Sequence, residues 1–191
     1  MFLCHLEEHA ANELHIYTDG SKSDDGVAYA TINSETTVKR KIDPISSIYT
    51  AELHGIMEAI NLSSTYVNSK ITIFTDSKSS IQGITKLINR NPLIQEITDK
   101  AEQSPKQFIL CWVPSHVGVT GNERADQAAR SALSLENITP HRLVRSDVKA
   151  AMKRKIKENW KIAWASTQNN KLRAIAHDLG PLPNSSCRNR H

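Results

Sequence analysis

Cysteine and long apolar runs are both scarce in this chain of 191 residues. Its three cysteines, Cys4, Cys111 and Cys187, are far apart and form no CxxC pair, which argues against a disulfide framework and against a zinc site. No apolar run approaches the roughly 18–20 residues needed to cross a bilayer. Residues 1–9 lack the basic and apolar regions of a secretory signal. We therefore expect an intracellular protein, in the nucleus or the cytoplasm, that is neither secreted nor in a membrane.

Charge is distributed unevenly along the chain, although the overall composition is that of an ordinary soluble protein. Residues 1–140 carry 12 basic and 17 acidic side chains, whereas residues 141–191 carry 12 basic and 3 acidic ones. An acidic body with a basic tail suggests that the tail meets a polyanion. The alternative is a lysine-rich helix that is simply solvated.

The pattern of apolar residues predicts five strands and five helices. Alternating or β-branched runs predict strands at 14–19, 26–33, 36–42, 70–75 and 107–113. Helical spacing predicts helices at 50–66, 77–88, 93–103, 121–135 and, after an N-cap at Ser146, up to Trp164. Three successive strands followed by alternating helices and strands predict an α/β fold. Its five-stranded mixed sheet has three antiparallel strands, then two parallel ones, with helices on both faces.

The chain length allows one domain plus an appendage. We expect a lead-in at 1–12, the main domain at 13–135, a basic helical extension at 136–180 and a disordered polar tail at 181–191. Trp160 and Trp164 lie four residues apart in the extension and are expected to pack rather than to stack on bases.

Four carboxylates stand out by their positions in these elements. Asp19 and Asp76 end the first and fourth predicted strands, Glu52 lies in the first turns of a helix, and Asp126 lies one turn inside another. If the first and fourth strands are neighbours, Asp19 and Asp76 emerge together at the carboxyl ends of the sheet, where ligand sites form. Taken singly, each acid is more often a turn or cap residue than a ligand.

Acids gathered in this way repel one another unless cations neutralise them. Hard oxygen ligands suit Mg²⁺, with Mn²⁺ as a substitute. Two such ions roughly 4 Å apart can activate water and stabilise the leaving oxygen of a phosphodiester.

The combined motifs resemble those of type 1 ribonuclease H. The matching segments are Thr18-Asp19-Gly20-Ser21, Thr50-Ala51-Glu52-Leu53, Thr75-Asp76-Ser77, Asn122-Glu123-Arg124-Ala125-Asp126 and the histidine loop Trp112-Val113-Pro114-Ser115-His116-Val117-Gly118. This resemblance covers about residues 13–135. It implies the RNase H-like fold, two Mg²⁺ ions held by Asp19, Glu52, Asp76 and Asp126, and His116 as a mobile catalytic residue that assists proton movement or product release.

Substrate contacts are expected from short polar groups beside the acids, because an RNA–DNA hybrid is distinguished through its 2′-hydroxyls across the minor groove. The candidates are Gly20, Ser21, Ser77 and Asn122. For Asn122, a helix N-cap is an equal alternative.

The chain departs from the cellular enzymes at two places. Ile48-Tyr49-Thr50 stands where those enzymes often carry paired asparagines, and no basic, Trp-rich helix lies between Ser77 and Phe108. These departures make a strong preference for the hybrid less secure than metal-dependent hydrolysis. The sequences of these motifs are similar to those in the RNase H domain of non-LTR, Jockey-like retrotransposon polyproteins. This resemblance implies other parts of a reverse-transcribing polyprotein as partners.

The resemblance implies a monomeric endoribonuclease that hydrolyses the RNA strand of RNA–DNA hybrids. One alternative is a catalytically inactive, nucleic-acid-binding relic of the same fold. Another is a related polynucleotidyl transferase or DNA nuclease, since the fold alone does not define the function.

Overall fold

The computed structural model describes residues 13–166. Its sheet has five strands in the order β3-β2-β1-β4-β5. The strands are β1 Glu13–Ser23, β2 Gly26–Ile32, β3 Thr37–Ile42, β4 Lys70–Thr75 and β5 Gln107–Trp112. The pairs β1–β2 and β2–β3 are antiparallel, whereas β1–β4 and β4–β5 are parallel. The predicted mixed sheet is therefore confirmed, with β1 and β4 as neighbours.

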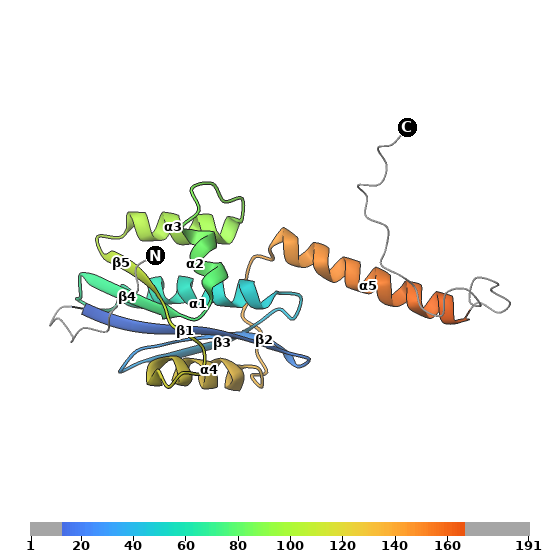
Figure 1. The fold of residues 1–191 in the computed structure, drawn as a ribbon, viewed down its shortest axis with the longest axis horizontal. Coiled ribbons are helices and arrows are strands. Elements are labelled where there is room, and N and C mark those ends of the chain that lie inside the picture. Colours follow the sequence, from blue (N-terminus) through green and yellow to red (C-terminus); the bar gives the residue numbers. More distant parts are fainter. Residues whose placement is uncertain (1–12, 167–191) are drawn as a thin grey trace. The chain divides into compact units, whose positions relative to one another are not determined.

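Helices cover both faces of the sheet, as the sequence predicts (Figure 1). One face carries α1 Ile48–Ser63, α2 Lys78–Ile84 and α3 Pro92–Gln103, and the opposite face carries α4 Thr120–Ala132. The main core lies between the sheet and α1 and α3. Its fully or almost fully buried side chains include Ile16, Ile71, Ile73, Leu53, Ile56, Ile94 and Ile97.

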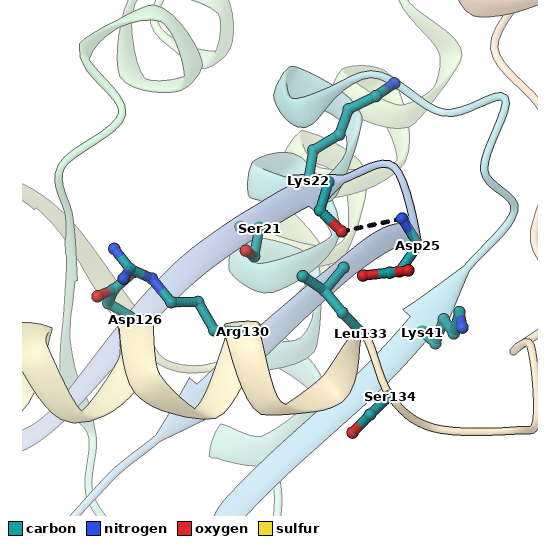
Figure 2. Close-up of a pocket in the computed structure, with 10 residues that line it drawn as sticks. Ser21, Lys22, Asp25, Lys41, Asp126, Arg130, Leu133 and Ser134 are labelled. Atoms are coloured by element: carbon teal, nitrogen blue, oxygen red, sulfur yellow. Dashed lines mark hydrogen bonds and ion pairs between the residues drawn. The ribbon is translucent and has the colours of Figure 1, made fainter.

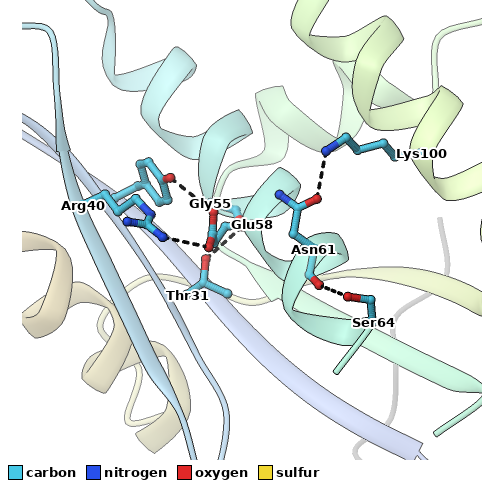
Figure 3. Close-up of polar contacts among 8 residues, drawn as sticks. Thr31, Arg40, Gly55, Glu58, Asn61, Ser64 and Lys100 are labelled. Atoms are coloured by element: carbon cyan, nitrogen blue, oxygen red, sulfur yellow. Dashed lines mark hydrogen bonds and ion pairs between the residues drawn. The ribbon is translucent and has the colours of Figure 1, made fainter. Parts of the chain in front are cut away.

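Polar contacts fix the position of α1 against its neighbours (Figure 3). Thr31 of β2 donates a hydrogen bond of 2.9 Å from Oγ1 to the Gly55 carbonyl. Arg40 of β3 lies 3.7 Å from the Glu58 carboxylate. On the other side, Lys100 of α3 donates to Asn61 Oδ1 over 2.9 Å. The helix is thus tied to both the sheet and α3.

Strand β1 extends four residues beyond Asp19, which corrects the expectation that the strand ends there. Its parallel pairing with β4 stops at Thr18, opposite Thr75. Its antiparallel pairing with β2 continues to Ser23. The tight turn to β2 keeps the β1–β2 hairpin paired beyond the last residue of β4. Asp19 is therefore the first residue of β1 after its pairing with β4 stops.

The chain after α4 folds back onto β3. Ile138 forms a parallel bridge to Lys41, and the Thr139 amide donates to the Lys41 carbonyl over 2.7 Å. Val144 is buried. A compact unit accordingly extends to Asp147, while residues from Val148 onward form a second unit. The proposed functional division at residue 135 stays a prediction, and the lead-in 1–12 and the tail 181–191 lie outside the described residues.

The helix α5 Arg145–Ser166 opens one residue before the predicted cap at Ser146. It carries seven basic and two acidic residues. Four of its lysines, Lys149, Lys153, Lys157 and Lys161, recur every four residues and follow one ridge of the helix. Among the described residues, no helix is long and apolar enough to cross a bilayer.

Candidate active site

Three of the four predicted acids converge at the edge of the sheet. Asp19 and Asp76 each follow the last residue of the parallel β1–β4 pairing, and Glu52 reaches the same edge from α1. One carboxylate oxygen of each lies within 4.8 Å of the others. Neighbouring parallel strands end at the same edge, which explains why acids 57 positions apart meet.

Burial makes this cluster electrostatically unfavourable by itself. Asp19 is 5% exposed and Glu52 is 7% exposed. Desolvation, reinforced by the charges of Asp76 and Asp126, raises the pKa of Asp19 to about 7. Desolvation and the charges of Asp19 and Asp76 also raise the pKa of Glu52 well above its ordinary value. Asp19 Oδ2 and Glu52 Oε2 are buried without a hydrogen-bond partner among the described residues.

Gly20 allows Glu52 to approach β1 closely. A Cβ atom at Gly20 would lie 3.0 Å from the Glu52 backbone nitrogen and 3.1 Å from its carboxylate. The Gly20 backbone amide donates a hydrogen bond to Glu52, which partly offsets the rise in pKa. The predicted substrate residue Gly20 therefore has a role in seating Glu52.

Asp126 lies near the cluster but outside the group of converging oxygens. Its Oδ1 accepts a hydrogen bond of 2.8 Å from Nε of Arg130, one turn further along α4, and the two side chains form an ion pair (Figure 2). Its charge still contributes to the raised pKa of Asp19. Asp126 and Arg130 line a cleft of about 860 Å³ that also contains Gly20 and the predicted substrate residue Ser21. The predicted set of four acids is thus a group of three, in which Asp19 and Glu52 are buried and Asp76 is half-buried, plus a separately paired fourth.

The histidine loop contacts the acids through a residue that the sequence pattern did not single out. Ser115 Oγ donates a hydrogen bond of 2.7 Å to Asp76 Oδ2. His116 is exposed and adopts a positive φ of 56°. Trp112 Nε1 anchors the start of the loop on the Asp76 carbonyl at 3.0 Å. Ser115 and Arg130 were missed because their roles depend on side-chain direction, although Arg130 stands four residues after Asp126 on a helix.

The remaining substrate candidates have different surroundings. Ser77 is the N-cap of α2, where its hydroxyl accepts from the Ser80 amide. Asn122 is not an N-cap, which corrects that alternative, because α4 already begins at Thr120 and its cap is Val119. The turn at Val119 leads directly into the helix, which therefore begins one residue before the predicted start at Gly121. Asn122 is 3% exposed, and its Oδ1 has no partner among the described residues.

The strand order, the helices on both faces and the acids at the β1–β4 edge define an RNase H-like fold with a candidate metal centre. The family model described as RNase H matches residues 11–134. The chain belongs to the RNase H family.

Relatives and a solved structure agree with this assignment. A Pol polyprotein of equine infectious anemia virus is 32% identical over 134 residues, which cover 65% of this chain and 11% of the polyprotein. A ribonuclease H of Cereibacter sphaeroides is 30% identical, covering 64% of this chain and 96% of that protein. The crystal structure of RNase H1 from the archaeon Halobacterium salinarum shares the fold, with a TM-score of 0.50, 19% identity, and coverage of 63% of this chain and 97% of the archaeal one. The chain spans about a tenth of the viral polyproteins it matches.

The acid cluster fits a divalent cation. Its donors are carboxylate oxygens, which Mg²⁺ and Mn²⁺ prefer. The two buried oxygens without partners belong to this same cluster. A bound cation would supply the positive charge that they lack, and would lower the cost of keeping the acids ionised.

Proposed function

We propose that this chain is an endoribonuclease that hydrolyses the RNA strand of RNA–DNA hybrids with Mg²⁺. The observation that carries the proposal is the convergence of Asp19, Glu52 and Asp76, with two buried oxygens unpartnered, at the sheet edge. Asp126 is proposed as the fourth ligand, and its release from Arg130 would accompany ion binding. Two bound ions would supply charge stabilisation and an activated water at the scissile phosphate.

The chain's own residues would position the substrate and move protons. Ser21 and Gly20 lie in the cleft beside Asp126, where a sugar–phosphate backbone could rest. Ser77 and the buried Asn122 are proposed as further contacts to the 2′-hydroxyls or phosphates. His116 is exposed on its loop, and an ordinary imidazole titrates near neutral pH, which suits it to accept or donate a proton during product release.

The basic helix α5 is proposed to add phosphate contacts outside the cleft. Its lysine ridge repeats every four residues, which is about 6 Å along a helix. Contacts of this kind increase affinity for any nucleic acid and weaken as salt rises. The part of the extension beyond residue 166 lies outside the described residues.

The sequences of the motifs and the match to viral Pol polyproteins support an origin in a reverse-transcribing polyprotein. We propose the Jockey-like, non-LTR retrotransposons as the nearest group, with other parts of that polyprotein as partners. The chain is proposed to act as an intracellular monomer, in the nucleus or the cytoplasm.

The first test is cleavage of an end-labelled RNA–DNA hybrid with Mg²⁺, and with EDTA. Asp76→Asn is compared with Asp99→Asn, which removes an exposed carboxylate of α3. We expect cleavage of the hybrid's RNA strand alone, abolished by EDTA and by Asp76→Asn but not by Asp99→Asn.

Single-stranded RNA, duplex RNA and duplex DNA serve as substrate controls. Binding of the hybrid without cleavage, in Mg²⁺ and also in Mn²⁺, would instead identify a catalytically inactive relic. Cleavage of duplex DNA would mean that the fold carries a different nuclease.

A further inference from the structure

The first turn of α1 lacks an acidic residue of its own. Its N-cap is Ser47, whose hydroxyl accepts from the Thr50 amide at 3.2 Å. The N-terminus of a helix carries a partial positive charge and amides without intrahelical partners, so a carboxylate placed there is stabilising. No residue of this first turn supplies such a carboxylate to the helix that carries Glu52.

Asp147 supplies it from 100 residues further along the chain. Its Oδ2 accepts a hydrogen bond of 2.9 Å from the Ser47 amide and one of 2.6 Å from Thr50 Oγ1. Asp147 is 5% exposed. A buried carboxylate is costly unless it is hydrogen-bonded, and these two hydrogen bonds offset that cost.

A second contact holds the same turn. His141 Nε2 lies 2.9 Å from Ser46 Oγ, one residue before the N-cap. His141 and Asp147 both belong to the segment that folds back after α4, which the family match to residues 11–134 does not include. The entry of the chain into α1 is thus held from outside the matched segment.

The clamped turn leads directly to Glu52. Thr50 is 1% exposed and stands two residues before Glu52 in the same helical turn. Glu52 approaches β1 so closely that a Cβ atom at Gly20, which glycine lacks, would lie only 3.0 Å from its backbone nitrogen. A change in the tilt of this turn would therefore move the Glu52 carboxylate relative to Asp19 and Asp76. Cation binding tolerates such displacements poorly.

We propose that Asp147 is a positioning residue that holds the first turn of α1, and with it Glu52, in the arrangement that binds divalent cations. The inference rests on the proposed function, in that Glu52 is taken as a metal ligand. Asp147 acts through Thr50 and the helix and does not touch the ions. The segment up to Asp147 is accordingly part of the metal-binding unit.

The test measures Mn²⁺ binding by calorimetry in the full chain, at a temperature where circular dichroism shows every variant to be folded. Asp147→Asn and Asp147→Ala are expected to weaken Mn²⁺ binding about tenfold, as loss of an outer partner of a metal ligand does. They should lower kcat for the hybrid and leave KM unchanged. Asp147→Glu should restore part of the affinity.

Two control variants separate positioning from stability. Glu136→Gln removes an exposed charge from the same connecting segment and should leave Mn²⁺ binding unchanged. Ser63→Ala removes a buried hydrogen bond at the opposite end of α1, about three turns from Glu52, and should lower the melting temperature without weakening Mn²⁺ binding.

Asp147 variants that melt earlier but bind Mn²⁺ like the wild type would overturn the inference, as would a wild type that binds no Mn²⁺. A wild type that binds Mn²⁺ in an Asp147-dependent way but does not cut the hybrid would support the inference while refuting the proposed function.

Discussion

Glu52 and His54 stand two residues apart on α1, and burial moves their pKa values in opposite directions. Glu52 faces Asp19 and Asp76, so desolvation and like charge raise its pKa. His54 stacks on Tyr29 and meets His141 edge-on, with ring centroids 5.0 Å apart. Desolvation, and then the charge of His141, lowers the pKa of His54 to about 4.

The difference lies in what each cluster can gain from outside. The lowered pKa keeps His54 neutral near pH 7, and a neutral imidazole needs no counter-ion, although its buried Nε2 has no hydrogen-bond partner among the described residues. The acid cluster must either hold protons or recruit a cation. Both side chains have a buried atom without a partner among the described residues, but that of Glu52 is an anionic oxygen, which points to a cation as its ligand.

The largest effect is expected when the acid cluster loses a member. Asp19→Asn should lower hybrid cleavage by roughly 10²–10³-fold, because it removes charge that holds the ions beside the phosphate. His54→Gln changes a residue of α1 that does not belong to the acid cluster. It should leave the cleavage rate within about twofold under the same conditions. Single-turnover rates at saturating Mg²⁺ measure both. Equal losses in the two variants would contradict the assignment of the site.

A smaller loss is expected at Asp126, because it stands apart from the other acids in an ion pair with Arg130. Asp126→Asn should reduce cleavage about 10–100-fold and raise the Mg²⁺ concentration needed for half-maximal rate. Glu136→Gln, which removes an exposed carboxylate from the segment after α4, is the control. A loss as deep as that of Asp19→Asn would show that Asp126 joins the cluster fully when ions bind.

Stability without metal should depend on pH in opposite ways for the two clusters. The raised pKa of Asp19 gives stability that is full below its ordinary value of 3.8 and is lost as pH rises through about 7. The lowered pKa of His54 gives stability that is full above its ordinary value of 6.5 and is lost as pH falls toward about 4. At about 1.4 kcal/mol per pKa unit, the contribution should be on the order of 4 kcal/mol for Asp19 and 3 kcal/mol for His54.

Urea unfolding in EDTA across this pH range measures both contributions. Asp19→Asn should remove the loss at rising pH, and His54→Gln should remove the loss at falling pH. Added Mg²⁺ should restore stability at neutral pH in the wild type but not in Asp19→Asn. Unchanged pH profiles in the variants would mean that other groups dominate.

The smallest effect is expected from the basic helix, which contributes no residue to either cluster. A chain ending at Asp147 keeps the contacts of that residue with α1 and loses most of the basic helix. Binding of the hybrid should weaken a few-fold at low salt. The plot of the logarithm of the binding constant against the logarithm of the salt concentration should become less steep, by about 1 or more in its slope. An unchanged slope would mean that the extension does not contact nucleic acid.

Much of the fold was predictable from local patterns. The alternating residues of β1, the β-branched and aromatic content of β2 and the apolar run of β4 predicted the mixed sheet, and the helical spacing in α1 predicted its buried face. Errors fell at element ends. Strand β1 runs past Asp19 because β2 continues to pair with it, and α4 begins before Asn122 because the preceding turn closes at Val119. Both depend on partners distant in the chain or on backbone conformation, which local composition does not report.

The sequence alone determined the chemistry available to this protein: carboxylates at strand ends, a histidine in a glycine-containing loop, and a basic helix after an acidic body. The tertiary structure decided which of these groups act together. It placed Asp19, Glu52 and Asp76 within reach of one ion, left Asp126 with Arg130, and attached Asp147 to the helix that carries Glu52. The physical reason is that local propensity defines strands and helices, whereas long-range pairing and burial define which charges lose water and which find a partner.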